Sequence, residues 1–212
     1  MIKVPSSKSR LSNDDAIYRQ LSRDACCDQP RSEYLCQAEF DRIEQLRPLE
    51  RFELKRVYRQ LAPPMISEVD AEYGAVMLSQ GGGLSTTIVR RAFSSQGPWI
   101  GKGFRPLTVT QGEGYNVFGD PYDRQIKLLM DTYIAQSNVA EGTAYILDYR
   151  QRNRGAICWL RGELRVLSEN VLLGFGTFGP WRNSLRRFRR SIPFLLYRTG
   201  ASVLPLSSTH AA

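Results

Sequence analysis

The chain has 212 residues, a formal net charge of +8 and 42% hydrophobic side chains, which suits one domain with extensions. It has no apolar run near the roughly 18 residues of a membrane-spanning helix, and its first residues lack the apolar centre of a secretory signal. Its four cysteines show no paired C-x-x-C spacing, which favours free thiols in a reducing cytoplasm over disulfides or a zinc site.

The N-terminal third is expected to be helical. Residues 1–30 are polar, and we interpret them as a flexible extension. Two helices are expected within residues 32–61, the second opened by Pro48 and ended before the following Ala-Pro-Pro. The spacing of apolar residues on this second helix predicts a core-facing stripe formed by Leu49, Phe52, Val57 and Leu61.

A change of pattern follows the second helix. Residues 65–78 predict a short turn and then a strand from about Glu72, although a helix fits them nearly as well. Three glycines at 81–83 break this element, and residues 84–93 have the spacing of a short connecting helix. The segment from Gly97 to Phe118 is rich in glycine and aromatic residues and alternates with a period of two, which is typical of strongly curved strands.

The rest of the chain reads as short strands joined by hairpin turns, which favours an antiparallel meander. The expected strands are 124–134, 143–149, 156–160, 163–167, 171–178 and 192–197, and residues 199–212 read as a tail. We therefore predict one domain over 31–198, mainly β with N-terminal helices (α+β). Its core is an antiparallel β-barrel of about 8–10 strands over residues 68–198. A hairpin within a β-sandwich is the alternative.

Several kinds of chemistry are excluded by composition. The single histidine, His210, is the third residue from the end, so no histidine base or histidine metal cluster is expected. No G-x-x-x-x-G-K-[ST] motif is present, and Gly112-Glu113-Gly114 does not stand between a strand and a helix as a dinucleotide site requires. We expect no metal and no cofactor.

Acidic residues among apolar strands are the catalytic candidates. Asp131 and Asp148 lie on expected strands, and either would become a general acid or base if it pointed into an apolar cavity. Tyr149 is the third candidate, because a buried phenol can hydrogen-bond a carbonyl or an enolate. The structural alternative is that each aspartate pairs with one of the many arginines.

The walls of a barrel interior are expected to be aromatic. The candidate ligand-binding residues are Tyr73, Trp99, Phe104, Tyr115, Asn116, Phe118, Tyr133, Tyr145 and Trp159. The alternative is that these tyrosines are ordinary core or rim residues.

Positive charge is concentrated near the C-terminus. Residues 149–212 contain eleven arginines, no lysine, and only Glu163 and Glu169 as acids. Within the arginine-rich segment 179–190 the anion-binding candidates are Arg182, Arg186, Arg187 and Arg190. This segment would suit an anionic membrane surface or a gate over a pocket, with a solvated loop as the alternative. Nucleic acid is the weakest option, because no known reading module surrounds these residues.

Three short motifs resemble those of lipocalin-like (calycin) barrels and of uncharacterised bacterial families built on that theme. Ala71-Glu72-Tyr73-Gly74 stands where these families have G-x-W-x-G, and Trp99–Phe104 matches W-x-G-K-x-F. The strand Gly162–Leu167 followed by Leu172-Leu173-Gly174 is similar to their closing strands. The resemblance covers roughly residues 50–198 and implies a barrel without implying a particular ligand.

Two hypotheses of function follow. The first is a cytoplasmic barrel that holds a hydrophobic small molecule of lipid, polyketide or terpenoid type in its interior. The second is a cofactor-free cyclase or isomerase acting on such a molecule through Asp131 or Asp148 and a tyrosine. A third possibility is a peripheral membrane or partner-binding module that uses residues 179–190.

Overall fold

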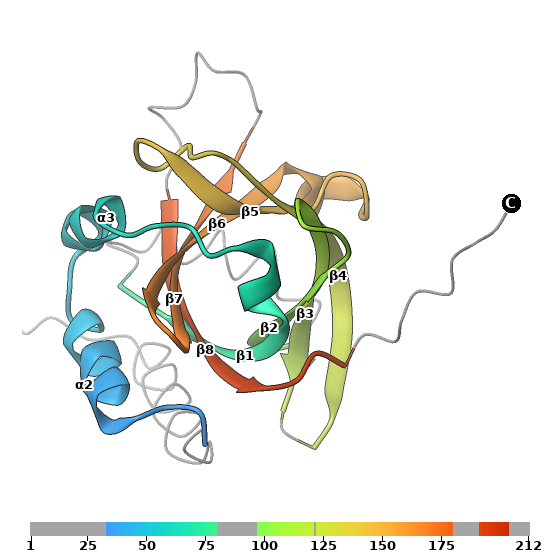
Figure 1. Cartoon of the computed structure of the whole chain (residues 1–212). Coiled ribbons are helices and arrows are strands. Elements are labelled where there is room, and N and C mark those ends of the chain that lie inside the picture. The colour runs from blue at the N-terminus through green and yellow to red at the C-terminus, as the bar shows by residue number, and fades with distance from the viewer. Residues whose placement is uncertain (1–32, 80–96, 121, 180–190, 204–212) are drawn as a thin grey trace, which may run out of the picture. The chain divides into compact units, whose positions relative to one another are not determined.

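Eight antiparallel strands form a closed barrel in which each strand pairs with its neighbours in chain order and the last pairs with the first (Figure 1). The computed structural model describes residues 33–79, 97–120, 122–179 and 191–203. The expected antiparallel barrel is confirmed. Its strands are β1 (Ala71–Met77), β2 (Trp99–Pro106), β3 (Gln111–Gly119), β4 (Arg124–Gln136), β5 (Thr143–Asp148), β6 (Leu160–Ser168), β7 (Val171–Phe178) and β8 (Ser191–Gly200).

Irregular pairing and close packing curve the sheet. The register shifts within the β1–β8, β2–β3, β3–β4 and β6–β7 pairs, as expected where bulges bend a closing sheet. Gly103 on β2 shows why glycines stand in these strands. A Cβ at this position would lie 2.1 Å from Cζ of Tyr115, because the end of that ring lies against the outer face of β2. The glycine–aromatic pattern that predicted curvature therefore marks close contact between neighbouring strands.

Strands β7 and β8 are buried on both faces. Along β7, Leu172, Gly174 and Gly176 face the barrel interior, whereas Leu173 and Phe175 face an outer core beneath the helices. The apolar run of this strand is thus explained by two separate cores, because alternate side chains of a strand point to opposite faces.

Two helices cover this outer face. Helix α2 (Gln37–Leu46) begins with Glu39 accepting a hydrogen bond from the Cys36 amide at 3.2 Å. Helix α3 (Arg51–Arg59) begins at Arg51 rather than at Pro48. Both helices lie within the range expected to be helical.

The stripe expected on and beside α3 is confirmed in part, because Leu49, Val57 and Leu61 pack against the outer core. Leu54 and Tyr58 are fully buried, while Phe52 is 64% exposed. Tyr58 packs edge-on against Phe175, with ring centroids 5.1 Å apart. Leu54 and Tyr58, at positions i and i+4 of the helix, are therefore the centre of this stripe, and Phe52 is the expected member that lies outside it.

Arg165 on β6 links α3 to the barrel wall. Its guanidinium donates to the carbonyl oxygens of Tyr58 at 3.0 Å and Arg59 at 3.4 Å, at the C-terminal end of the helix. The guanidinium also donates to the backbone carbonyl oxygens of Thr143 and Glu141, and its central carbon lies 4.7 Å from the centroid of the Tyr58 ring. A buried cation therefore satisfies the last carbonyls of the helix and complements its dipole.

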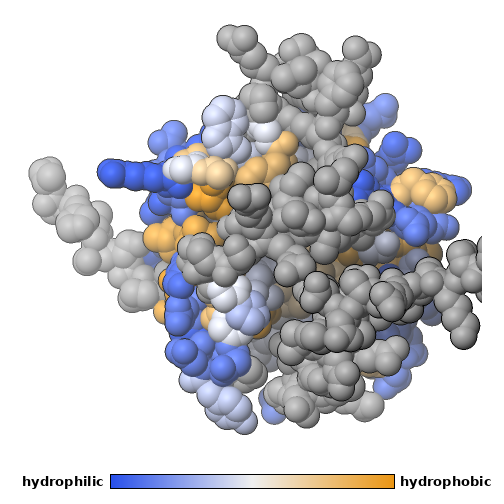
Figure 2. Space-filling model, turned by 180° about the vertical axis from the view of Figure 1, so that it is seen from behind, coloured by the Kyte–Doolittle hydropathy of each residue, from blue (hydrophilic) through white to orange (hydrophobic). Residues whose placement is uncertain are grey.

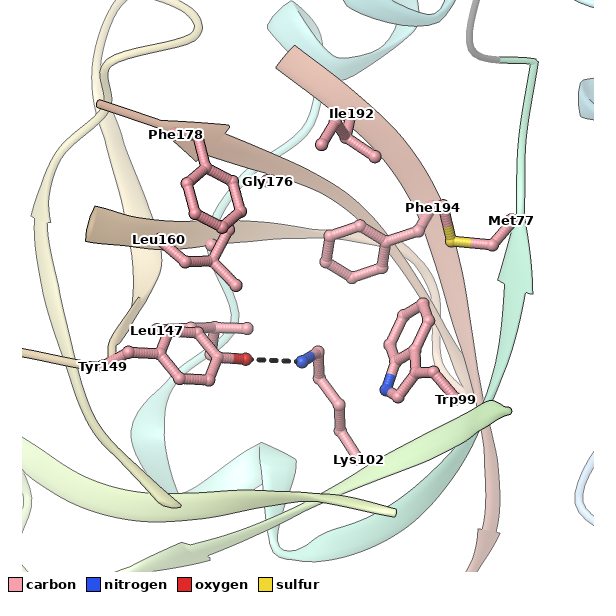
Figure 3. Close-up of a pocket in the computed structure, with 11 residues that line it drawn as sticks. Met77, Trp99, Lys102, Leu147, Tyr149, Leu160, Gly176, Phe178, Ile192 and Phe194 are labelled. Carbon is pink, nitrogen blue, oxygen red and sulfur yellow. Dashed lines mark hydrogen bonds between the residues drawn. The ribbon is translucent and has the colours of Figure 1, made fainter. Parts of the chain in front are cut away.

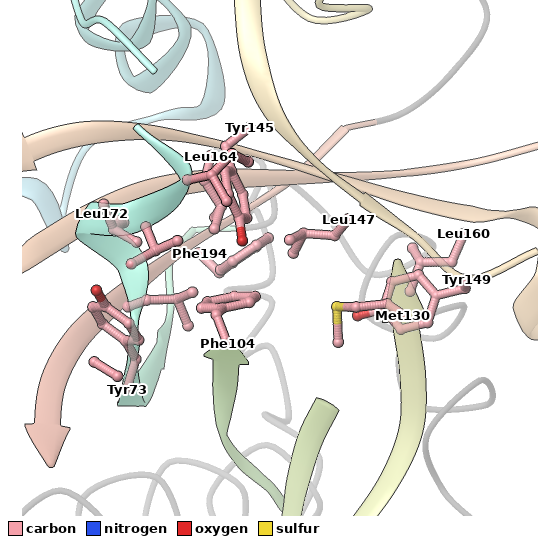
Figure 4. Close-up of a cluster of buried hydrophobic side chains, with 14 residues drawn as sticks. Tyr73, Phe104, Met130, Tyr145, Leu147, Tyr149, Leu160, Leu164, Leu172 and Phe194 are labelled. Atoms are coloured by element: carbon pink, nitrogen blue, oxygen red, sulfur yellow. The ribbon is translucent and has the colours of Figure 1, made fainter. Parts of the chain in front are cut away.

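A short 3₁₀ helix, η1 (Ile66–Val69), closes one end of the barrel (Figure 1). Ile66 and Val69 are buried in the interior core. Figure 4 shows the aromatic rings of Tyr73, Phe104 and Tyr145 in the same cluster. Phe104 contacts the other two rings, with centroids 5.8 Å and 5.7 Å away. This end is filled with side chains.

The surface is mixed in polarity. Seen from behind, apolar groups stand among hydrophilic ones (Figure 2). On β4, Ile126, Leu129 and Ile134 are 38–43% exposed. Among the described residues, no helix is long and apolar enough to cross a membrane.

Some expected elements lie outside the described residues. These are the extension 1–30, the connecting helix 84–93, almost all of segment 179–190 and most of the tail. The last strand runs to Gly200, past the expected end of the domain. Beyond it, the Val203 amide donates to the Tyr115 hydroxyl at 3.0 Å.

Candidate functional site

A cavity occupies the barrel end opposite η1. Residues at the C-terminal ends of β1, β5 and β7 line it, together with residues from the N-terminal halves of β2, β6 and β8. These parts of the strands meet at one end of the barrel because neighbouring strands are antiparallel. The cavity and the open space at its mouth together measure about 450 Å³. Its lining residues, most of them drawn in Figure 3, are Met77, Trp99, Lys102, Leu147, Tyr149, Leu160, Gly162, Gly176, Phe178, Ile192 and Phe194.

Lys102 is the charged residue of this lining. It projects from β2 into the interior because it alternates with Gly101 and Gly103, which face outward. Its side chain is buried, and Nζ lies 4.9 Å, 5.4 Å and 5.9 Å from the ring centroids of Trp99, Tyr149 and Phe194. Among the described residues it has no carboxylate partner.

Burial sets the protonation of this amine. Removal of water from around the ammonium group lowers the pKa of Lys102 from 10.5 to about 7. The neighbouring rings stabilise a cation too weakly to replace its hydration. Near neutral pH a large fraction of Lys102 is therefore a neutral amine, which has a free electron pair for a base or nucleophile.

Tyr149 is the nearest polar partner of Lys102. Nζ donates to the Tyr149 hydroxyl at 2.7 Å, the contact drawn in Figure 3. Burial raises the pKa of Tyr149 well above its ordinary value, although the hydrogen bond from Asn116 acts the other way. Tyr149 is therefore a phenol, able to donate a proton or a hydrogen bond, throughout the ordinary pH range.

Asn116 on β3 holds the pair in place. Its Oδ1 accepts a hydrogen bond from Lys102, and its Nδ2 donates to the Tyr149 hydroxyl at 3.1 Å. Nδ2 also donates to the Leu128 carbonyl at 3.0 Å. Leu128 stands in the β3–β4 bulge with a φ of 53°, a strained conformation for a branched residue. Such strain is commonest at functional sites, where surrounding contacts hold it.

The expected cavity residues divide between several places. Trp99 and Tyr149 line the cavity, and Trp99 is fixed by donation from Nε1 to the Gly101 carbonyl at 2.7 Å. Asn116 lies directly behind the Lys102–Tyr149 pair. Tyr73, Phe104 and Tyr145 belong to the closed end rather than to the cavity.

Four other expected wall residues do not line the cavity. Phe118 is buried but lies outside the lining, and Trp159, on the short helix η2 (Gly155–Trp159), is 49% exposed. Tyr115 lies on the outer face and donates to Glu72 at 2.9 Å. Tyr133 also lies outside and donates to Asp148 at 2.9 Å.

The two aspartates do not point into the cavity. Asp131 forms an ion pair with Arg152 at 2.7 Å. Asp148 forms one with Arg150 at 2.6 Å; burial acts to raise its pKa, but hydrogen bonds from Arg150 and Tyr133 outweigh this and lower it. The condition for an aspartate base, a position inside an apolar cavity, is therefore not met. The physical reason is that alternation places both residues on the outer face, beside arginines.

Other predicted sites lie elsewhere. The anion-binding candidates Arg182, Arg186, Arg187 and Arg190 fall outside the described residues. Within the part of the chain that the structure describes, no group of three or more His, Cys, Asp or Glu side chains could hold a metal ion.

Sequence reasoning missed Lys102 and most of the apolar lining. The signal was present, since Ile100, Lys102 and Phe104 alternate with glycines in the W-x-G-K-x-F stretch. A lysine is rarely buried, however, and the period of two alone does not reveal the inner face.

No protein-family model and no curated protein matches the chain in sequence. A crystal structure of a protein from Thermomonospora curvata is similar to it, with a TM-score of 0.48 and 16% sequence identity. The alignment covers 76% of this chain and 96% of that one. The chemistry of the cavity therefore rests on the residues that line it.

Proposed function

We propose that the barrel binds a small hydrophobic molecule of lipid, polyketide or terpenoid type in this cavity, in the manner of lipocalin-like barrels. One observation carries the proposal: an apolar cavity whose wall holds a buried amine without a carboxylate partner among the described residues. Apolar walls with a few fixed polar groups are the usual composition of small-molecule sites.

The walls suit a compact ligand. The volume of about 450 Å³ includes open space outside the mouth, and the room for the centres of water-sized molecules is about 40 Å³, so the cavity itself is small. Gly176 contributes no side chain to the wall, so space remains beside Leu160 and Ile192, whereas the Leu147 side chain already fills the space in front of Gly162. A ring or a short branched chain fits this description better than a long acyl chain.

The polar pair would orient the ligand. An oxygen acceptor on the ligand would take a hydrogen bond from Lys102 or Tyr149, since both can donate into the cavity. Asn116 and Tyr149 accept two of the three hydrogens of the protonated amine, so a ligand oxygen that accepts the third would be preferred over a pure hydrocarbon.

The test compares two substitutions at one wall position. A Cβ on Gly176 would lie 3.6 Å from Leu160 and 3.9 Å from Ile192, which is ordinary contact, so Gly176→Ala keeps the wall intact. Gly176→Leu puts three further carbons into the cavity. We expect the wild type and Gly176→Ala to retain a co-purified lipophile in native mass spectrometry and to bind the neutral dye 1-N-phenylnaphthylamine.

Gly176→Leu should lose both signals while its thermal unfolding stays cooperative. If all three proteins bind the dye no better than a non-binding control, the cavity is not a ligand site. Equal strong binding by all three would place the ligand elsewhere.

A cofactor-free cyclase or isomerase is the second candidate. Lys102 and Tyr149, 2.7 Å apart, would replace the aspartates: the neutral amine would take a proton beside a carbonyl, and the phenol would donate to its oxygen. Deuterium uptake from D₂O into the α-position of a bound ketone, abolished in Lys102→Met, is the expected outcome. Unchanged uptake in that variant would remove Lys102 from the mechanism.

Two further proposals concern location and partners. We propose a cytoplasmic protein, supported by Cys36 and Cys158, which are both free thiols. Segment 179–190 remains a proposed anion-binding element, either a gate for the cavity or a contact with an anionic membrane, since its arginines would attract acidic lipid.

A further inference from the structure

The amine of Lys102 has features that simple binding does not use. The chain contains five lysines, at positions 3, 8, 55, 102 and 127. Of the three within the described residues, Lys102 lines the cavity, while Lys55 stands on helix α3 and Lys127 on the barrel wall. Nζ of Lys102 is held by Asn116 and Tyr149 at the surface of an apolar space. A primary amine that is desolvated in an apolar pocket is activated as a nucleophile toward carbonyl compounds, and the phenol beside it can donate a proton.

We propose that Nζ of Lys102 forms a reversible imine with the carbonyl carbon of a small hydrophobic aldehyde or ketone held in the cavity. This inference rests on the proposed function, since the carbonyl compound is the ligand, and it adds the ligand's chemical class and a covalent bond to it.

The step balances without an oxidant or a reductant. The electron pair of the neutral amine forms a C–N bond to the carbonyl carbon, and the π pair of the C=O bond moves to oxygen. That oxygen takes a proton from Tyr149, which regains one from the nitrogen to leave a neutral carbinolamine. Loss of the hydroxyl with the second nitrogen proton releases one water and leaves C=N. The reverse reaction with water regenerates the amine and the carbonyl compound.

Three features of the site favour this reaction. The lowered pKa of Lys102, about 7, supplies neutral amine near pH 7, where an ordinary lysine of pKa about 10.4 is almost fully protonated. The neutral fraction is therefore about a thousandfold larger than for an exposed lysine. Asn116 fixes the nitrogen, and the rings of Trp99 and Phe194 exclude water from the product.

The experiment traps the imine in the full-length protein. The probe is trans-cinnamaldehyde with sodium cyanoborohydride at pH 7, followed by intact mass and peptide mapping. Each trapped imine adds the mass of the aldehyde less one oxygen atom. We expect one adduct, at Lys102, formed ~10-fold or more faster than any adduct at Lys55 or Lys127, because of these three lysines Lys102 is the one that lines the cavity and so meets the bound aldehyde.

Variants test the role of the cavity. Lys102→Met and Gly176→Leu should lose the fast adduct, and Gly176→Ala should keep it. Tyr149→Phe should slow the formation of the adduct, because the proton donor is lost, while Lys102 remains the labelled residue. Mapping of the wild type decides the question even if a variant fails to fold. A first adduct at Lys55, at Lys127 or at the N-terminus would overturn the proposal.

Cinnamyl alcohol separates the two failures. It has the shape of the probe but no carbonyl, so its binding, read by calorimetry, tests the proposed function alone. If cinnamyl alcohol binds but the aldehyde leaves no fast adduct at Lys102, the imine proposal is wrong and the proposed ligand site stands. Failure of both to bind or react overturns the proposed function and the imine with it.

The pH profile supplies a second readout. The groups that face Nζ are the Tyr149 hydroxyl, the Asn116 amide and the rings of Trp99 and Phe194. Among the described residues only Tyr149 titrates there, and its pKa is raised by burial. Fast labelling should therefore rise with a midpoint near pH 7, and a midpoint above pH ~9 would overturn the proposal.

Discussion

Replacing Lys102 by methionine removes a buried amine and keeps a side chain of similar length. The amine has a pKa of about 7 in the folded protein and about 10.4 in the unfolded chain. Between these values the unfolded state binds more protons than the folded state, so the free energy of unfolding rises with pH. Below pH ~7 the amine is protonated in both states and its cost is constant; above pH ~10.4 it is neutral in both and the cost is gone.

The magnitude follows from the difference in pKa. At about 1.36 kcal/mol for each pH unit, the fall from 10.5 to about 7 amounts to a cost on the order of 5 kcal/mol at neutral pH. Lys102→Met does not carry this cost. The stability of the variant minus that of the wild type should therefore decrease by several kcal/mol between pH ~7 and pH ~10, because other titrating groups are shared and cancel.

The assay is urea unfolding followed by tryptophan fluorescence at about four pH values across that window and constant ionic strength. Lys127→Met, at a half-buried position on the barrel wall, is the matched control, and its difference from wild type should change much less with pH. A difference between wild type and Lys102→Met that stays constant from pH ~7 to ~10 would show that Lys102 is not a desolvated amine.

Three other substitutions test the parts of the fold that position the site. Phe104→Ala should lower the free energy of unfolding in urea by about 3–5 kcal/mol, as for other buried aromatic residues. The affinity for cinnamyl alcohol should stay within ~2-fold of wild type, because Phe104 belongs to the closed end of the barrel and does not line the cavity. A large loss of affinity would place Phe104 in the site. Gly103→Ala should destabilise the barrel by about 1–3 kcal/mol through contact with the Tyr115 ring, and adding Tyr115→Ala should cost less than the two changes separately; strict additivity would contradict the contact. Arg165→Met should lower stability by about 2–4 kcal/mol, because the carbonyls of Tyr58 and Arg59 lose a buried donor; an unchanged urea midpoint would refute that role.

Most strands could be predicted from the sequence because turn residues and a period of two mark them locally, but the expected strand 156–160 is largely the 3₁₀ helix η2. The inner face could not be predicted, since apolar residues occupy both faces where the helices cover β7 and β8. Tyr115 and Asn116 are neighbours in sequence, and they lie on opposite sides of the wall. The aromatic ring of Tyr115 made it a stronger candidate for the cavity wall than Asn116. The alternation of side chains along β3 instead directs Asn116 to the inner face and Tyr115 to the outer face.

The position of a residue along the barrel axis could not be predicted from the sequence either. Phe104 and Lys102 are both on the inner face of β2, but one meets the aromatic cluster at the closed end and the other the cavity. Which end is filled depends on η1, a segment more than thirty residues earlier in the chain. Asp131 and Asp148 illustrate the same limit, because the sequence offered pairing with an arginine only as an alternative to a catalytic role. The strand register places the two aspartates opposite each other on the outer wall, where each pairs with an arginine.

The final strand of the barrel has a consequence for how the chain must fold. Strand β8 pairs with β1, about 120 residues earlier, and also supplies Leu195 and Tyr197 to the core beneath the helices. A growing chain that ends before Ser191 therefore has an open sheet and helices whose apolar faces lack part of their cover. Contacts so distant in sequence make folding slow, because a long loop must close before they form. Synthesis of the last strand completes both cores at once, so the helices and the barrel should gain their protection from hydrogen exchange together.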